Sequence, residues 1–340
     1  MIVAETMRAA FIDAKDVLEV REAETPTPGE GQVRLHVDFV GICGSDLHYY
    51  FDGANGEYAV REPLVPGHEM SGRVDLDPSG RFAAGTPVTV HPARFGEPSA
   101  GIENEPHLWA RGSYLGSAST WPHTQGAMSE YLIVEADMVR PLPDGLSIRR
   151  ASLAEPLGVA LHAVSRAGDL SGARVLVSGA GPIGLLAIVA AQERGAAQVT
   201  VSDVLPEALA RASALGASGT IRVGVDAMPP EAFDVVLECS GAPVAISSAG
   251  VAVRKRGTIV QVGMVPNEPR PVNLAPIISK EVKLVGTFRF RDEVDEAVAV
   301  LARRADVEGV ITHEFPLEDA VEAFAVARDG TISGKVVVAL

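Results

Sequence analysis

The chain has 340 residues, of which 47% are hydrophobic, and its formal net charge is −15. The length suits two domains, and the acidic charge argues against a nucleic-acid partner, whose binding depends on clustered Lys and Arg. With two cysteines, no run of about 18 apolar residues and no signal-peptide pattern, we expect no disulfide framework, no membrane association and a cytoplasmic location.

Up to residue 154, the sequence predicts short strands separated by Pro and Gly. Four runs are rich in β-branched and aromatic residues: 32–42 (QVRLHVDFVGI), 70–76 (MSGRVDL), 86–92 (TPVTVHP) and 129–135 (SEYLIVE). This pattern predicts an irregular, mainly antiparallel, barrel-like domain.

From residue 155 onward, predicted strands alternate with predicted helices. Strands are expected at 173–178, 198–202, 233–240, 257–263 and 283–290, and helices at 182–194 and 206–215. Such alternation is typical of a doubly wound parallel sheet with helices on both faces. The segment 292–340 resumes with a helix, a strand, a helix and a strand. We therefore predict an α/β protein with a β-rich catalytic domain in 1–154, a nucleotide-binding domain in 155–291 and a return segment, 292–340, that packs on the first domain.

A glycine-rich stretch, 179–184 (GAGPIG), follows the predicted strand at 173–178 and opens the predicted helix. This is the G-x-G-x-x-G pattern of dinucleotide-binding sites. Gly179 would permit the tight turn, Gly181 would let a pyrophosphate approach the backbone, and Gly184 would let the helix pack closely on the strand. The helix N-terminus would add free N–H groups for the phosphates.

Asp203 ends the next predicted strand, 19 residues after Gly184. A carboxylate at this position accepts hydrogen bonds from the adenine ribose hydroxyls. It would also repel the extra phosphate of NADP, and the first basic residue after it is Arg211, so NAD is the expected cofactor. The alternative is that the glycines form ordinary turns and that Asp203 caps a helix.

The first domain contains candidate metal ligands. Cys43 and His68 offer a thiolate and an imidazole, which zinc binds, and Glu69 and Glu155 are acidic candidates for a further ligand. Cys239 lies in an apolar predicted strand and is expected in the core. Taken alone these residues are ambiguous, because a buried Cys or His more often serves packing than metal binding.

Five segments together resemble the zinc-containing medium-chain alcohol dehydrogenases: 41–50 (GICGSDLHYY), 66–74 (PGHEMSGRV), 154–164 (AEPLGVALHAV), 179–184 (GAGPIG) and 286–290 (GTFRF). The resemblance spans essentially the whole chain and is greatest to the sorbitol (polyol) dehydrogenase branch with its L-idonate 5-dehydrogenases. Glu155 indicates this branch, because the alcohol dehydrogenases have a zinc-binding cysteine at that position. The resemblance implies a GroES-like catalytic domain, a Rossmann domain, zinc, NAD and a homodimer or homotetramer.

The resemblance also implies roles for individual residues. The implied metal ligands are Cys43, His68, Glu69 and Glu155, the two glutamates binding directly or through water. The implied catalytic residues are Ser45 and His48, as a proton relay, and Glu155. The implied cofactor contacts are Gly179, Gly181, Pro182, Ile183, Gly184, Asp203, Val262, Gly263, Phe288 and Arg289.

Two further expectations concern the surroundings of the metal. Asp46 is expected to hydrogen bond to the far nitrogen of His68, with a helix cap as the alternative. The lobe at 91–117 has no cysteine, whereas relatives carry four that bind a structural zinc, so we expect one zinc per chain. Packing of Phe95, Trp109 and Tyr114 would then hold the lobe.

The implied substrate contacts are Tyr49, His123 and Arg289, of which Arg289 would pair with a carboxylate. The favoured hypothesis is oxidation of a secondary hydroxyl of a sugar acid, of the L-idonate to 5-ketogluconate type. The first alternative is a neutral polyol such as sorbitol or xylitol. The second is a redox sensor or binding protein without turnover, against which the complete set of ligand candidates argues.

Overall fold

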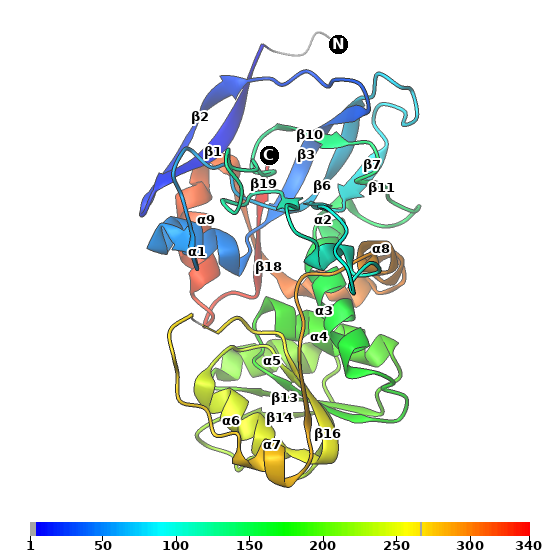
Figure 1. Ribbon diagram of the computed structural model, residues 1–340. Helices are drawn as coiled ribbons and strands as arrows, with labels where there is room; N and C mark the ends of the chain where they lie inside the picture. The colour runs from blue at the N-terminus through cyan, green and yellow to red at the C-terminus, as the bar shows by residue number, and fades with distance from the viewer. Residues whose placement is uncertain (1–4, 266) are drawn as a thin grey trace. The chain divides into compact units, whose positions relative to one another are not determined.

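The structure, a computed structural model, describes residues 5–265 and 267–340 and divides into two compact units (Figure 1). Unit 1 comprises Met1–Glu155, Val294–Asp329 and Lys335–Leu340, and unit 2 comprises Pro156–Glu293 and Gly330–Gly334. In the sequence, unit 2 is therefore an insertion into unit 1. Within the described residues, no helix combines the length and the apolar character needed to cross a bilayer.

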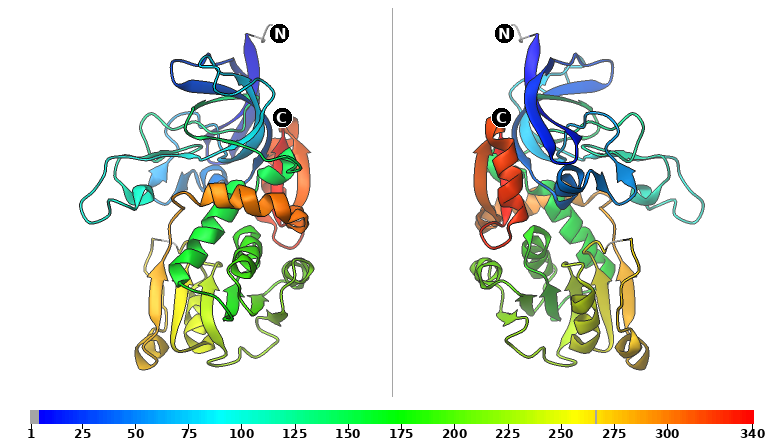
Figure 2. Two further views of the ribbon diagram at one scale, coloured as in Figure 1. Left: turned by 90° about the vertical axis from the view of Figure 1, so that its right-hand side faces the viewer. Right: turned by 90° about the vertical axis from the view of Figure 1, so that its left-hand side faces the viewer.

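Unit 1 contains a seven-stranded sheet with the path β11-β7-β6-β3-β19-β18, and β10 also pairs with β3. Only the β18–β19 pair is parallel among the pairings of this sheet. Figure 2 shows the C-terminal strands and helix beside the N-terminal strands of this unit. The strands are β3 (Gln32–Gly41), β6 (Glu69–Leu76), β7 (Pro87–Val90), β10 (Tyr131–Glu135), β11 (Val139–Pro141), β18 (Ile311–Pro316) and β19 (Lys335–Ala339).

Smaller elements surround this sheet. Three hairpin-like pairs are β1 (Thr6–Ala14) with β2 (Val17–Glu24), β4 (Ala54–Asn55) with β5 (Tyr58–Ala59), and β8 (Ala93–Arg94) with β9 (Ser113–Tyr114). The helices are α1 (Gly44–Asp52), α2 (Ile148–Ala151), α3 (Ala154–Ala167), which continues into unit 2, α8 (Glu293–Arg303) and α9 (Ala320–Arg328). Short 3₁₀ turns are η1 (Pro106–Leu108), η2 (Ala305–Val310) and η3 (Leu317–Asp319).

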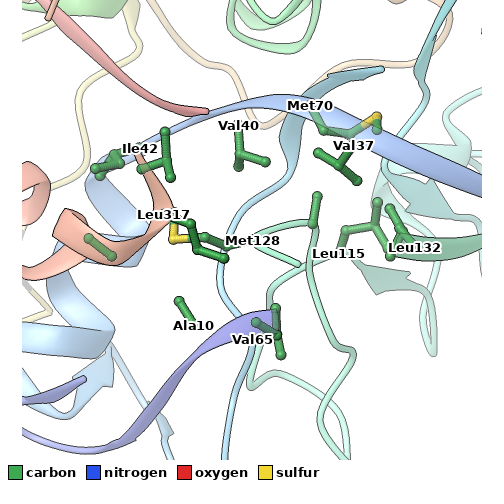
Figure 3. Packing of buried hydrophobic residues seen from close by; sticks show 14 of the residues in the cluster. Ala10, Val37, Val40, Ile42, Val65, Met70, Leu115, Met128, Leu132 and Leu317 are labelled. Carbon is green, nitrogen blue, oxygen red and sulfur yellow. The ribbon is translucent and has the colours of Figure 1, made fainter. Parts of the chain in front are cut away.

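The core of unit 1 joins segments that are far apart in the sequence (Figure 3). Val37 and Val40 of β3 pack in the same cluster as Met70 of β6, Leu132 of β10 and Leu317 of the C-terminal segment. Each such buried side chain contributes about 1.5–3 kcal/mol relative to an exposed one. This cluster supports the ends of β3 and β6, where the candidate metal ligands begin.

Unit 2 is a six-stranded parallel sheet with the order β14-β13-β12-β15-β16-β17. In chain order this is 3-2-1-4-5-6, the order of the dinucleotide-binding sheet, in which ligands bind at the carboxyl ends of the strands where the order reverses. The predicted parallel sheet is confirmed. The strands are β12 (Arg174–Ser178), β13 (Gln198–Asp203), β14 (Gly219–Arg222), β15 (Phe233–Glu238), β16 (Val253–Gln261) and β17 (Lys283–Gly286).

The helices of unit 2 pack against different strands of the sheet. α4 (Pro182–Glu193) and α5 (Pro206–Ala214) contact β12, β13 and β14, whereas α6 (Pro243–Ala252) contacts β15 and β16 and is joined by α7 (Ala275–Ser279). The strand predicted at 283–290 ends earlier, at Gly286, because its partner β16 ends at Gln261. Arg289 therefore follows the strand, with a left-handed backbone φ of 49°.

Candidate metal and cofactor sites

The metal-site candidates begin at the N-terminus of α1. Cys43 precedes the first turn of this helix, and the Oδ2 atom of Asp46 accepts a hydrogen bond from the Cys43 amide at 2.9 Å. The Oδ1 atom of Asp46 accepts from the Gly67 amide at 3.2 Å. Asp46 thus ties the segment that carries Cys43 to the segment that carries His68.

The prediction of a hydrogen bond between Asp46 and His68 is wrong. Both oxygens of Asp46 accept from backbone amides, and Nδ1 of His68 is buried without a hydrogen-bond partner among the described residues. The helix-cap alternative holds, because a carboxylate three residues after the cap satisfies an amide that the helix leaves free. Burial raises the pKa of Asp46, which His68 and the two amides only partly oppose.

Cys43, His68 and Glu69 form a compact cluster, with one ligand atom from each lying within 4.8 Å of the others. Burial lowers the pKa of His68, but Cys43, Asp46 and Glu155 outweigh this effect and raise that pKa to about 10. The groups around His68 therefore favour a positive charge at this position.

This cluster fits a zinc ion. One of its buried atoms, Nδ1 of His68, has no hydrogen-bond partner in the described part of the chain. Buried polar atoms are normally paired, so an unpaired imidazole nitrogen beside a thiol and a carboxylate fits a metal ligand. Sulfur, nitrogen and oxygen are also the donor set that zinc accepts. Cys239 lies outside this cluster in unit 2, where burial raises the pKa of its thiol and keeps it protonated.

Glu155 lies at the start of α3, and its Oε1 atom accepts a hydrogen bond from the Tyr114 hydroxyl at 2.5 Å. Burial, together with the charge of Glu69, raises the pKa of Glu155 against the opposing effects of His68, Tyr114 and Lys335. The Tyr114 ring is edge-on to the ring of His68, with centroids 5.3 Å apart. The cysteine-free lobe thus contributes a hydroxyl group beside the candidate metal ligands.

Sequence reasoning missed Lys335, which stands at the start of β19. Its side chain is only 3% exposed, and its Nζ atom lies 2.7 Å from Oε1 of Glu69 and 2.9 Å from the carbonyl oxygen of Ile42. The pairing of β19 with β3, and of β3 with β6, brings this lysine next to Glu69. A lysine that begins an otherwise apolar strand (KVVVAL) was the signal available in the sequence.

The predicted relay residues lie on successive turns of α1. Ser45 is half-buried in the first turn, and His48 is exposed, with Nδ1 2.8 Å from Oδ2 of Asp52. Tyr49, the predicted substrate contact on the same helix, is buried, and its hydroxyl accepts from the Ala118 amide at 3.1 Å. Tyr49 is therefore held both by the core of unit 1 and by the segment that follows the lobe.

Other predicted residues of unit 1 make contacts within the lobe and its neighbours. His123 is buried, with Nε2 accepting from the Arg61 amide at 2.9 Å and Nδ1 3.0 Å from the Thr120 carbonyl oxygen. A substrate contact by this ring would require one of these two hydrogen bonds to break. Trp109 donates from Nε1 to the Ile102 carbonyl oxygen at 2.9 Å, a bond that helps to hold the cysteine-free lobe.

In unit 2, the glycine-rich stretch forms the turn between β12 and α4. Gly179 has φ 96°, which favours glycine, and a Cβ on Gly184 would overlap the carbonyl oxygen of Gly179. A Cβ on Gly181 would meet nothing within 4 Å, so open space lies beside this backbone. The turn therefore combines tight internal packing with free access at Gly181, as an approaching phosphate requires.

Asp203 lies at the end of β13 and is tied to this turn. Its Oδ2 atom accepts from the Ala180 amide at 2.7 Å, and its Oδ1 atom accepts from the Leu205 amide at 2.9 Å. Arg211, the first basic residue after Asp203, donates a hydrogen bond to the Gly330 carbonyl oxygen at 2.6 Å. Asp203 is half-buried, and each oxygen keeps a lone pair for a further donor.

The remaining predicted cofactor residues lie after β16 and β17. The amides of Val262 and Gly263 both donate to the carbonyl oxygen of Glu238 at 2.8 Å. Phe288 is exposed, and the guanidinium of Arg289 lies 4.9 Å from the centroid of its ring. The left-handed backbone of Arg289 is costly for a residue with a side chain, and such strain is common at functional sites.

Comparison with known proteins agrees with both units. Residues 29–144 match the alcohol dehydrogenase GroES-like domain, and residues 182–303 match the zinc-binding dehydrogenase domain. The chain is 36% identical to L-idonate 5-dehydrogenase (NAD(P)(+)) of Escherichia coli (strain K12), over 87% of this chain and 88% of that enzyme. The chain belongs to the zinc-containing medium-chain alcohol dehydrogenases. The fold class expected from the sequence, GroES-like plus Rossmann, is thereby confirmed.

A second relative and a solved structure place this dehydrogenase in the polyol branch. It is 34% identical to sorbitol dehydrogenase of Gallus gallus, over 92% of this chain and 91% of that enzyme. The crystal structure of L-idonate 5-dehydrogenase from Escherichia coli str. K-12 substr. MG1655 superposes with a TM-score of 0.93 at 32% identity, covering 98% of both chains. Zinc and a nicotinamide dinucleotide are typical of this family, which agrees with the donor cluster of unit 1 and the glycine-rich turn of unit 2.

Proposed function

We propose that this dehydrogenase transfers a hydride from a secondary hydroxyl of a sugar acid to NAD, in a reaction of the L-idonate to 5-ketogluconate type. The observation that carries this proposal is the 36% identity, over 87% of the chain, to L-idonate 5-dehydrogenase. A chain of net charge −15 needs a local cation to bind an anionic substrate, and Arg289 in its strained backbone position is our candidate.

We propose that one zinc ion binds per chain, at Cys43 and His68, with Glu69 and Glu155 as direct or water-bridged ligands. The unpaired Nδ1 atom of His68 and the acidic groups that raise the pKa of His68 support this assignment. When bound, the zinc would supply positive charge that makes a substrate hydroxyl easier to deprotonate. The lobe at 91–117 has no thiol for a second zinc. Purified protein should contain about one zinc per chain, and a content near two would contradict the single site.

The chain's own residues would then move the hydroxyl proton outward. Ser45 follows Cys43 by two residues, and His48 lies three residues further along the same helix, so both can share one face of α1. We propose that Ser45 accepts the proton from the substrate hydroxyl while it donates its own hydroxyl proton to His48, and that exposed His48 releases a proton to water. We propose that Glu155 acts beside the metal, with its carboxyl group oriented by the hydrogen bond from Tyr114.

For the dinucleotide, we propose that Gly179, Gly181 and Gly184, with the neighbouring Pro182 and Ile183, receive the pyrophosphate. Asp203 would accept from the adenine ribose hydroxyls and select NAD over NADP. Four further residues would contact the rest of the cofactor, whose nicotinamide accepts the hydride: Val262, Gly263, Phe288 and Arg289.

A substrate panel tests the proposed function. NADH formation is measured with hexonates, pentonates, hexitols and pentitols, and the aldonates should give the highest kcat/KM. The neutral polyols are the second candidate, which the 34% identity to sorbitol dehydrogenase favours. Arg289→Leu should raise KM for an aldonate much more than for a polyol of equal length. Equal losses on both would assign Arg289 a general role and make the polyol reading the better one. Tyr49 and His123 are the other proposed substrate contacts.

We also propose a homodimer or homotetramer located in the cytoplasm. β17 is the edge strand of its sheet, and exposed apolar side chains gather on it and on the adjoining segment, including Leu274, Ile278 and Leu284. An unpaired apolar edge strand is a ready site for pairing with a second copy. Both cysteines are free thiols, and Cys43 must stay reduced to bind zinc, which suits a reducing compartment. Size-exclusion chromatography with light scattering tests the assembly.

A further inference from the structure

Glu238, at the carboxyl end of β15, is a fully buried carboxylate with an exposed fraction of 0%. All the hydrogen-bond donors that reach it in the described part of the chain are neutral: the Ser240 amide and hydroxyl, the Gly241 amide, the Gln261 side chain and, at 3.5 Å, the Ser178 hydroxyl. A buried carboxylate without a cation is unfavourable for stability, and neutral hydrogen bonds offset this only partly. A role other than stability therefore needs to be considered.

The hydrogen bonds of Glu238 join three segments at the carboxyl ends of the central strands β12, β15 and β16. Oε1 accepts from the Ser240 amide at 3.0 Å, and Oε2 accepts from the Gly241 amide at 3.0 Å, which folds the chain back after β15. Oε2 also accepts from Nε2 of Gln261, at the end of β16, at 2.6 Å. Through these contacts and Ser178 of β12, the carboxylate connects the ends of the central strands of unit 2.

The same loops are in direct backbone contact with the glycine-rich turn. A Cβ on Gly179 would lie 2.9 Å from the Ser240 amide nitrogen, so this loop and the turn have no space between them. A Cβ on Gly263 would overlap the Gly241 amide nitrogen, and one on Gly241 would overlap the Met264 carbonyl oxygen. A shift of the Ser240–Gly241 segment would therefore displace the backbone at both Gly179 and Gly263.

We propose that Glu238 is a positioning residue for the dinucleotide. It holds the loops after β12, β15 and β16 in the arrangement that receives the cofactor, without touching the cofactor itself. This inference rests on the proposed function, because it assumes that the dinucleotide binds at the carboxyl ends of these strands. Its basis is that one carboxylate accepts hydrogen bonds from all three segments. These segments also pack backbone against backbone at Gly179, Gly241 and Gly263.

Glu238→Gln is the test, because it keeps the size of the side chain but replaces an acceptor oxygen with an N–H donor. That donor would face the Gly241 amide or the Ser240 amide, which also donate, so the loops must shift. We expect the dissociation constant for NADH, measured by fluorescence titration, to rise about tenfold, the equivalent of about 1.4 kcal/mol. Zinc content should stay unchanged, because the metal cluster belongs to unit 1.

Asp234→Asn is the matched control. Asp234 lies near the amino end of β15 and accepts hydrogen bonds from Arg174 of β12 and Arg254 of β16. It therefore joins the same three strands at their amino ends. It should lower the melting temperature of unit 2 without changing NADH affinity. If Glu238→Gln also lowers only the melting temperature, Glu238 is merely structural and the inference is wrong.

Two milder variants keep the test open if Glu238→Gln does not fold. Ser240→Ala and Gln261→Leu each remove one donor to the carboxylate and should each weaken NADH binding while zinc content is retained. Unchanged NADH affinity in both would overturn the inference. If the unaltered protein binds no NADH, the proposed function fails instead, and the two failures are thereby distinguished.

Discussion

Replacement of Lys335 by methionine would test whether the ammonium group of Lys335 stabilises the buried carboxylate of Glu69. Methionine keeps much of the side-chain volume but removes the ammonium group that lies 2.7 Å from Glu69 Oε1. The Glu69 carboxylate, 1% exposed, would then be a buried charge without its partner, beside Cys43 and Glu155. Burial disfavours the charged lysine, but the nearby acidic groups raise its pKa and keep it charged across the neutral range.

The expected cost follows from this geometry. Removal of one partner from a buried ion pair destabilises a protein by about 3–5 kcal/mol, because the other charge remains buried. The double variant Lys335→Met/Glu69→Gln removes both charges and should therefore lose less than the single variant. Saturating zinc should also reduce the loss in Lys335→Met, since a cation bound at the cluster would take over part of the role of the lysine.

Urea unfolding followed by tryptophan fluorescence measures this loss in the unit concerned. The chain has two tryptophans, Trp109 and Trp121, and both belong to unit 1. The measurement is made in EDTA and again with zinc, for the single variant, the double variant and the unaltered chain. The argument that an unpaired Glu69 is the cause would be refuted by either of two results. One is a decrease of less than about 1 kcal/mol in the free energy of unfolding of Lys335→Met. The other is a decrease in the double variant as large as that in Lys335→Met.

Three further predictions concern proton transfer, cofactor choice and acid stability. Ser45→Ala should lower kcat at pH 7 by about 10²–10⁴-fold while zinc content and NADH affinity are retained, and the loss should shrink at high pH; a near-normal kcat at pH 7 would show another proton path. Asp203→Ala should reduce the NAD-over-NADP ratio of kcat/KM by about tenfold, and equal use of both cofactors by the unaltered enzyme would contradict the assignment. The His162 imidazole, 2.8 Å from Glu293, helps to lower the pKa of this buried carboxyl to about 2. This contribution to stability is present above the unfolded pKa of about 4.3 and is lost as the pH falls toward 2. Glu293→Gln should therefore destabilise unit 2 at pH 7 by on the order of 3 kcal/mol. The difference in stability between the variant and the unaltered chain should disappear in acid. Urea unfolding followed by circular dichroism checks this, and a difference independent of pH would count against it.

Local patterns were enough to predict five of the six strands in the sheet of unit 2, whereas β14 (Gly219–Arg222) was not predicted. The apolar run before the glycine-rich stretch was expected as a strand at 173–178 and forms β12 at Arg174–Ser178, and α4 begins at Pro182 as expected. Both signals are local, because strand runs, glycine turns and helix starts depend on neighbours in the sequence. Helix α1 was not predicted, since GSDLHYYFD has no clear apolar period, and its start depends on the cap formed by Asp46.

The surroundings of the metal cluster were harder to predict because they depend on pairing between distant segments. Lys335 reaches Glu69 only through the sheet register of β19, β3 and β6, and Tyr114 reaches Glu155 from a lobe with little regular structure. Candidate ligands were identified from their residue types and from the resemblance, whereas their charge partners required the fold. The error at Asp46 has the same origin, since the carboxylate is used by two backbone amides from separate segments.

The place of Lys335 in the last strand affects how the chain can fold during synthesis. The described part of unit 1 is completed by Lys335–Leu340, which are synthesised after Pro156–Glu293, the main segment of unit 2. Domains generally fold as units, starting from the N-terminal side as the chain emerges. The Glu69 carboxylate therefore lacks its lysine until β19 has been synthesised, while the nucleotide unit can already be largely folded.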